Sequence, residues 1–166
     1  MCDLNTIESK LDTLQGVYDI QGFIKDLEYQ LNQLIFYYKE LTPRQTGDPR
    51  QTLYLPKKYP KPHTLGYFNL TRGLPKELHG GHWCYILKVY RSKALIIPTT
   101  SQKSDSKELN DGQIIISVNN FINGNTTRLQ LGDIRSVDLQ RLYVGKGFYD
   151  VDTDRDLIID SLINNF

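Results

Sequence analysis

Cysteine is scarce in this chain, which has only Cys2 and Cys84 among its 166 residues. Two isolated cysteines cannot form the disulfide framework of a small secreted domain, and they lack the paired spacing of a zinc site. Histidine is also scarce, with three in the chain, and no cluster of His, Cys and carboxylate residues has ligand spacing. We therefore expect a protein of a reducing compartment with no metal and no other cofactor.

Long apolar runs are missing as well. Runs such as Ala94–Ile97 and Ile114–Ile116 are far shorter than the roughly 20 residues with which a helix crosses a bilayer. The first ten residues, MCDLNTIESK, are polar and lack the apolar stretch of a secretory signal peptide. These features predict a cytoplasmic protein without a membrane partner.

Neither sign of charge dominates, because the formal net charge at pH 7 is +1. The charges are unevenly distributed all the same. Residues 1–41 hold three basic and seven acidic side chains, residues 42–64 hold five and one, and residues 65–166 hold twelve and eleven. An electrostatic surface for nucleic acid is therefore possible only locally, in the middle segment or in a cleft.

Signature motifs of nucleotide and cofactor sites are absent. The chain has no Gly-rich phosphate loop followed by Lys and Ser or Thr, no Gly-x-Ser-x-Gly and no His-Glu-x-x-His. The sequence Gly145-Lys146-Gly147 stands alone, without a suitable strand before it. Nucleotide hydrolysis is therefore disfavoured.

Residues 4–41 show helical periodicity. Apolar side chains recur at steps of three and four in two series, and the phase slips near Gly16, Asp19 and Gly22. We expect a short helix, a break and a longer helix, whose apolar spacing resembles a coiled-coil seam for fewer than three heptads. This helical extension either packs on its own domain or forms an interface with a second chain.

Residues 42–63 form a second segment, TPRQTGDPRQTLYLPKKYPKPH, with five prolines. Because proline lacks an N–H and restricts φ, we expect neither helix nor central strand here, but a linker or an extended arm. Its Lys57, Lys58 and Lys61 are interleaved with tyrosines and can contact phosphates beside stacked bases. A solvated linker is the other interpretation.

From residue 64 the pattern changes to short runs bounded by turns, which is typical of strands. We expect an α+β domain, mainly β, over residues 64–166, with the strands forming a small barrel or a strongly twisted sheet. A final helix capped by Asp152 or Thr153 closes the chain. The expected strands are Leu65–Leu70, Trp83–Tyr90, Ala94–Thr99, Gln113–Val118, Thr127–Leu131 and Asp133–Val137.

The densest polar cluster lies at the end of the third expected strand. Thr100, Ser101 and Lys103 offer two hydroxyls and an ammonium, which can hold a phosphate. A Ser/Thr turn with a solvated lysine is the structural alternative.

A second cluster is His79-Gly80-Gly81-His82-Trp83. The glycine pair can place the His82 imidazole beside that phosphate, where it takes or gives a proton. The alternative is a histidine packed at the rim of the sheet. A third cluster, Ile134–Leu142, holds two arginines and an aspartate, for which we favour a structural ion-pair network.

The same stretch carries a family resemblance. Leu129–Leu142 reads LQLGDIRSVDLQRL and is similar to the pattern Q-I-R-T-I-D-x-x-R-L. Before it come a Gly-aromatic strand at 65–70, a glycine-containing loop at 74–81 and a strand ending in threonine at 96–101. In this order residues 64–166 resemble the MazF/PemK (Kid) toxins of bacterial toxin–antitoxin systems. Residues 100–103 also resemble the Thr-Ser-x-Lys of the ToxN/AbiQ ribonucleases.

The resemblance implies an SH3-like barrel of the CcdB/MazF type that forms a homodimer and is neutralised by a cognate antitoxin. It implies a metal-independent endoribonuclease that cleaves single-stranded RNA and leaves 2′,3′-cyclic phosphate and 5′-hydroxyl ends. The family's catalytic arginine, which follows the glycines of the first loop, is missing here, because His82 follows Gly81. Either His82 takes over, or Arg72 or Lys103 supplies the charge, or catalysis is lost.

We expect the site residues to converge on one pocket beside the first loop. The alternative function is a non-catalytic toxin, like the gyrase poison CcdB, or a module that binds nucleic acid or protein. The expected catalytic residues are His82, Thr100, Ser101 and Lys103, and the expected RNA contacts are Arg72, His79, Trp83, Lys57, Lys58 and Lys61.

Overall fold

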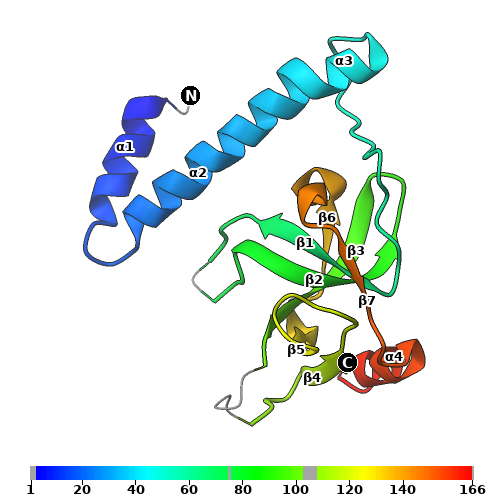
Figure 1. Ribbon diagram of the computed structural model, residues 1–166. Coiled ribbons are helices and arrows are strands. Elements are labelled where there is room, and N and C mark those ends of the chain that lie inside the picture. The colour runs from blue at the N-terminus through cyan, green and yellow to red at the C-terminus, as the bar shows by residue number, and fades with distance from the viewer. Residues whose placement is uncertain (1–2, 75, 103–107, 166) are drawn as a thin grey trace. The chain divides into compact units, whose positions relative to one another are not determined.

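The computed structural model describes residues 3–74, 76–102 and 108–165 (Figure 1). The chain divides into two compact units, Met1–Gln51 and Thr52–Phe166. The division falls inside the segment expected to be a linker or arm. In the described part of the chain, no helix combines the length and the apolar character needed to cross a membrane.

The first unit is helical, and the expected order of a short helix, a break and a longer helix is confirmed. Gly16, at φ 79°, lies in the break, and the Asp19 carboxylate caps the second helix by accepting a 3.0 Å hydrogen bond from the backbone N–H of Gly22. The elements are α1 (Leu4–Thr13), α2 (Ile20–Ile35), the π-helical turn η1 (Phe36–Leu41) and α3 (Thr42–Thr46).

The expectation that residues 42–63 contain no helix is wrong at their start, where α3 lies. Pro43 lies at the start of α3, directly after η1, where its fixed φ suits the helix. The Thr42 hydroxyl is buried and lies 2.8 Å from the backbone carbonyl oxygens of Tyr37 and Gln51. The helix ends at Gly47, whose φ of 73° suits a glycine.

The described residues of the second unit form seven strands, six of which match the expected ones to within three residues at each end. The short strand β7 had not been expected, because three residues carry too little alternation to be recognised. The strands are β1 (Thr64–Leu70), β2 (Gly80–Val89), β3 (Lys93–Ser101), β4 (Gln113–Ser117), β5 (Thr126–Gln130), β6 (Arg135–Asp138) and β7 (Phe148–Asp150).

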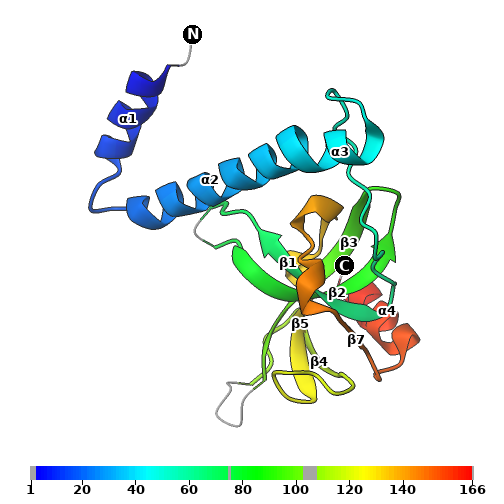
Figure 2. The same ribbon diagram turned by 45° about the horizontal axis from the view of Figure 1, so that its top comes forward.

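All strand pairs are antiparallel, in the order β4-β5-β3-β2-β1-β7, with β6 paired to β3. Figure 2 shows the β4–β5 hairpin projecting away from β1 and β2. The fold is therefore α+β and mainly β, as expected. The ladder does not close into a barrel, although a single bridge between Val118 and Val151 joins the ends of the two outer strands.

The last helix is α4 (Arg155–Ile163). Its cap is Asp154 rather than Asp152 or Thr153, because the Asp154 carboxylate accepts the 2.8 Å hydrogen bond from the Asp156 backbone N–H. The Thr153 hydroxyl instead accepts a 2.7 Å hydrogen bond from the Ser117 backbone N–H, which ties the start of the helix to β4.

Alternate residues of the central strands face two separate cores. Leu65, Tyr85 and Ile97 face the core covered by α4, which we call the α4 face. Phe68 and Ile96 face the core that includes Val137 of β6, which we call the β6 face. This alternation decides which side chains can meet at the ends of the strands.

Candidate functional site

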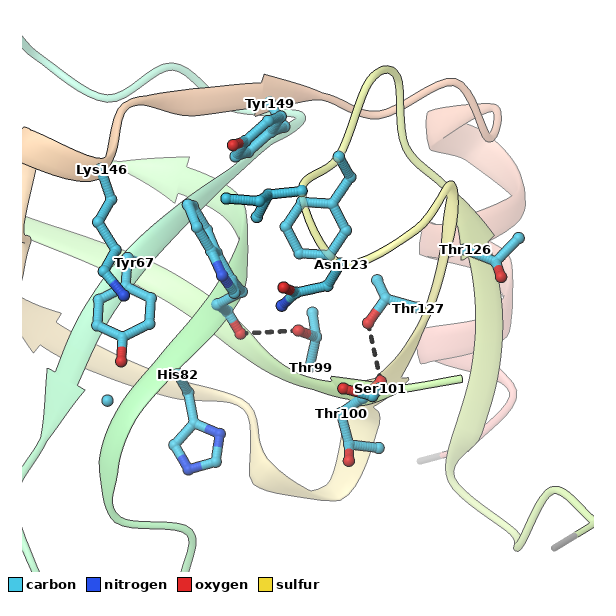
Figure 3. A pocket seen from close by; sticks show the side chains of 14 residues that line it. Tyr67, His82, Thr99, Thr100, Ser101, Asn123, Thr126, Thr127, Lys146 and Tyr149 are labelled. Carbon is cyan, nitrogen blue, oxygen red and sulfur yellow. Dashed lines mark hydrogen bonds between the residues drawn. The ribbon is translucent and has the colours of Figure 1, made fainter. Parts of the chain in front are cut away.

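A cavity of about 550 Å³ opens where β2 begins and β3 ends, beside the loop that joins β4 and β5. Fourteen described residues line it (Figure 3), among them the predicted His82, Trp83, Thr100 and Ser101. The structure therefore brings together three of the four expected catalytic residues and one expected RNA contact. Lys103, the fourth, lies outside the described residues.

The backbone around Thr100 and Ser101 is held by neighbouring side chains. The Thr99 hydroxyl donates to the Trp83 carbonyl at 3.0 Å, and the Thr127 hydroxyl donates to the Thr100 carbonyl at 2.8 Å (dashed in Figure 3). The side chains of Thr100 and Ser101 themselves are exposed. Two hydroxyls thus stand at the cavity on a fixed stretch of backbone.

The tautomer of His82 follows from its hydrogen bond. Its Nε2 lies 2.9 Å from the backbone carbonyl oxygen of His79. A carbonyl only accepts, so Nε2 carries the proton of the neutral imidazole and Nδ1 keeps its lone pair. His82 can therefore accept a proton at Nδ1. The backbone carbonyl of His79 therefore orients the His82 ring. His79, an expected RNA contact, is not itself among the cavity-lining residues.

The pleat of β2 and β3 places the cavity-lining side chains of these strands on two different faces of the sheet. Cys84 pairs with Pro98, and the same register continued by two residues sets His82 opposite Thr100. Both then belong to the β6 face, whereas Trp83 and Ser101 belong to the α4 face. Figure 3 shows the His82 ring and the Thr100 side chain at the lower edge of the view, below Thr99 and Asn123. The cavity lies at the strand ends, where residues from both faces reach it.

Aromatic rings form the α4-face part of the lining. Trp83 meets Tyr67 and Phe121 at centroid distances of 5.3 Å and Tyr149 at 5.1 Å, with interplanar angles of 74° to 88°. Trp83 is only 9% exposed, so it belongs to the core and the cavity wall at once. Edge-to-face contacts of this kind stabilise the packing of the wall.

Lys146 supplies a cation that the sequence analysis does not predict for the site. Its Nζ lies 3.6 Å from the centroid of the Tyr67 ring, on the turn η4 (Val144–Lys146). The Tyr67 hydroxyl in turn lies against Gly81, where an added Cβ would come within 2.0 Å of it. Gly81 therefore leaves space for the tyrosine. The described lining residues include His82 and Lys146 but no acidic side chain.

The remaining predicted RNA contacts lie elsewhere. Arg72 is half-buried in the loop after β1, and it is not among the residues that line the cavity. Lys57, Lys58 and Lys61 are exposed in the segment before β1 and do not line it either. The structure thus does not bring these four residues to the cavity.

The arginines of the third polar cluster make local structural contacts, and the ion-pair partner of Arg135 is Asp133, which lies just outside the cluster. Arg135 forms a 3.1 Å ion pair with Asp133, and its Nη1 donates to the Leu78 carbonyl at 3.3 Å. Arg141 donates to the Asn69 carbonyl at 3.3 Å, and burial lowers the pKa of its guanidinium. The two arginines hold both ends of the β1–β2 loop.

The cavity residues that sequence reasoning missed include Tyr67, Phe121, Asn123, Lys146 and Tyr149. They come from three separate stretches, so no local spacing connects them. The available signals were the glycine-flanked Lys146 and the aromatic strand that contains Tyr67.

Within the described residues, no three His, Cys, Asp or Glu side chains gather as they would around a metal ion. The chain matches no protein-family model, and no curated protein matches it.

Proposed function

We propose that the chain is an endoribonuclease that cleaves single-stranded RNA by attack of a ribose 2′-hydroxyl on the adjacent phosphate. The observation that carries the proposal is the composition of one cavity. It combines an imidazole, an ammonium and exposed hydroxyls, and the described lining residues include no carboxylate to repel a phosphodiester.

His82 acts as the general base. The His79 carbonyl holds the Nε2 proton, so Nδ1 is the atom that receives the proton of the 2′-hydroxyl. The resulting imidazolium stays hydrogen-bonded to that carbonyl, which stabilises its charge. His82 thus takes the place that the resembling family gives to an arginine.

The hydroxyls of Thr100 and Ser101 donate to the non-bridging phosphate oxygens. Their backbone is already fixed by the Thr99 and Thr127 hydrogen bonds, so little reorganisation is needed as negative charge develops. Lys146 adds positive charge, with Lys103 as a further candidate from the sequence.

The bonds and protons balance without a co-reactant. The 2′-oxygen forms a bond to phosphorus, and the bond from phosphorus to the 5′-oxygen breaks. The first proton goes to His82, and the leaving 5′-oxygen takes a proton from the Lys146 ammonium. The products are a 2′,3′-cyclic phosphate and a 5′-hydroxyl.

The test is incubation of the full chain with labelled single-stranded RNA in EDTA. We expect cleavage to cyclic-phosphate ends, and we expect a 2′-deoxy nucleotide at the cut position to block it. His82→Gln should lower the rate by on the order of a hundredfold with unchanged thermal unfolding. The matched control His79→Ala keeps the backbone carbonyl and should keep most of the activity. Full activity in His82→Gln, or its loss on adding EDTA, would contradict the proposal.

One observation favours a second candidate, a non-catalytic binding protein such as a CcdB-like gyrase poison. The described cavity lining includes no arginine, whereas the resembling family uses one for catalysis. RNA binding without cleavage, or inhibition of gyrase supercoiling by the purified chain, would support this candidate over the nuclease.

The resemblance extends the proposal to a cytoplasmic toxin with a cognate antitoxin, a homodimeric state and a distorted SH3-like barrel. The bridge between Val118 and Val151 supports the barrel, because it joins the two outer strands. Induced expression should arrest growth, and His82→Gln should relieve the arrest. Light scattering of the full chain and of a chain lacking residues 1–41 would show whether the helical extension contributes to a dimer.

A further inference from the structure

The aromatic part of the cavity has a shape and chemistry that phosphate cleavage does not require. Tyr67, Trp83, Phe121 and Tyr149 all line it, and their contacts with one another are edge-to-face. An aromatic ring that borders a cavity can stack on an unpaired base, which is how proteins hold such bases.

A polar group stands over this aromatic wall. The loop between β4 and β5 turns at Gly124, at φ 102°, and the Gly124 N–H donates to the Phe121 carbonyl at 3.1 Å. This turn buries Phe121 and leaves Asn123 at the cavity. In Figure 3 the Asn123 amide points inward from the loop, beside Thr127. An amide offers one donor and one acceptor side by side, which matches the edge of a base.

Size and charge limit the occupant. About 550 Å³ is within the range of small-molecule sites and admits one nucleotide rather than a folded partner. Lys146 places positive charge at the cavity, and the described lining includes no acid. An occupant with a planar ring and an attached phosphate satisfies all of these features.

We propose that the cavity binds one unpaired nucleobase of the RNA substrate and that Asn123 reads the edge of that base. The base stacks in the aromatic part, and its phosphate lies toward His82, Thr100 and Ser101. That the base belongs to RNA rests on the proposed function. That the cavity binds a base does not depend on cleavage.

The chain contains a single tryptophan, Trp83, so its intrinsic fluorescence reports directly on the cavity. The full chain is titrated with the four nucleoside monophosphates, with ribose 5-phosphate and with a short oligoribonucleotide. We expect at least one nucleoside monophosphate to change the fluorescence at a concentration about tenfold lower than ribose 5-phosphate does. Equal binding of ribose 5-phosphate would overturn the base pocket, and tighter binding of the monophosphate than of the oligomer would overturn RNA as the source of the base.

Asn123→Ala tests the reading of the base. We expect it to change the order of affinity among the four monophosphates while stacking still alters the fluorescence. The matched control is Asn125→Ala, an exposed asparagine of the same loop that is not among the cavity-lining residues, and it should keep the order. An unchanged order in Asn123→Ala would overturn its role. Base-selective binding without any RNA cleavage would support the pocket and reject the nuclease, whereas cleavage without base selectivity would do the reverse.

Discussion

The centre of the β2–β3 pair and its open end are built from the same two strands and behave differently. In the centre, Tyr85, Ile86, Ile96 and Ile97 have no exposed surface, because cores cover both faces of the sheet. At the end, exposed Thr100 and Ser101 line a cavity. The strands therefore provide a rigid centre that fixes the positions of groups at their ends.

The largest expected effect is a difference in stability between two substitutions in β3, one in the centre of the β2–β3 pair and one at its open end. Ile96→Ala in the centre should lower the free energy of unfolding by about 2–5 kcal/mol, because it leaves a cavity in the β6-face core. Thr100→Ala, four residues further along β3, should change the unfolding free energy by less than about 1 kcal/mol but reduce RNA cleavage. Denaturant titration and a cleavage assay on both variants test this. Equal destabilisation by both substitutions would remove the distinction.

The next effect probes the packing at the open end. Gly81→Ala sets a methyl group against the Tyr67 hydroxyl and should destabilise by about 1–3 kcal/mol while displacing the ring beneath Lys146. Adding Tyr67→Phe removes the nearest clashing atom and should restore part of the stability. The control Gly132→Ala meets no atom within 4 Å and should be nearly neutral. Thermal unfolding of these variants and Trp83 fluorescence are the measurements.

A smaller expected effect is the pH dependence of the unfolding free energy, which tests the buried centre of the β2–β3 pair. Burial raises the pKa of the Cys84 thiol and also that of the Tyr85 hydroxyl. A folded-state pKa above the unfolded one stabilises the protein below the unfolded value, here 9.0 for cysteine, and the stabilisation is lost as the pH rises beyond it. The unfolding free energy should therefore decrease above about pH 9, and less steeply in Cys84→Ala. Parallel curves for the two proteins would show that Cys84 does not contribute.

The smallest effect concerns residues outside both regions. Replacing Lys57, Lys58 and Lys61 by alanine should weaken RNA binding a few-fold at low salt and less at high salt, because exposed lysines interact with phosphates mainly through screened charge. The cleavage rate at saturating RNA should not change, since none of the three is among the cavity-lining residues. A large fall in that rate would mean that this segment contributes to the site.

Local patterns in the sequence predicted most of the helices and strands. Three- and four-residue spacing with a phase slip predicted α1, the break and α2, and turn-bounded apolar runs predicted six strands. Three features were not predicted. The helix α3 was not predicted because its proline lies where a helix tolerates it, and β7 was not predicted because it is too short to show a period. The cap of α4 was assigned to the wrong residue because several acidic and hydroxyl residues are adjacent there.

The site was predictable only in its local parts. Thr100 and Ser101 follow an apolar strand, and His82 follows two glycines, so their chemistry was visible in short segments of sequence. The cavity also uses Tyr67, Asn123 and Lys146, which lie in three different segments. Their convergence follows from antiparallel registers and turns, which no single segment contains.

The sequence by itself determined where strands and helices form and which residue types stand at their ends, because backbone sterics and hydrophobic periodicity act over a few residues. The tertiary structure alone decided that His82 and Thr100 line the same cavity, that Lys146 covers Tyr67 and that four aromatic rings line that cavity. These contacts join residues from 16 to 79 positions apart in the chain, and such contacts form only when strands pair and cores pack.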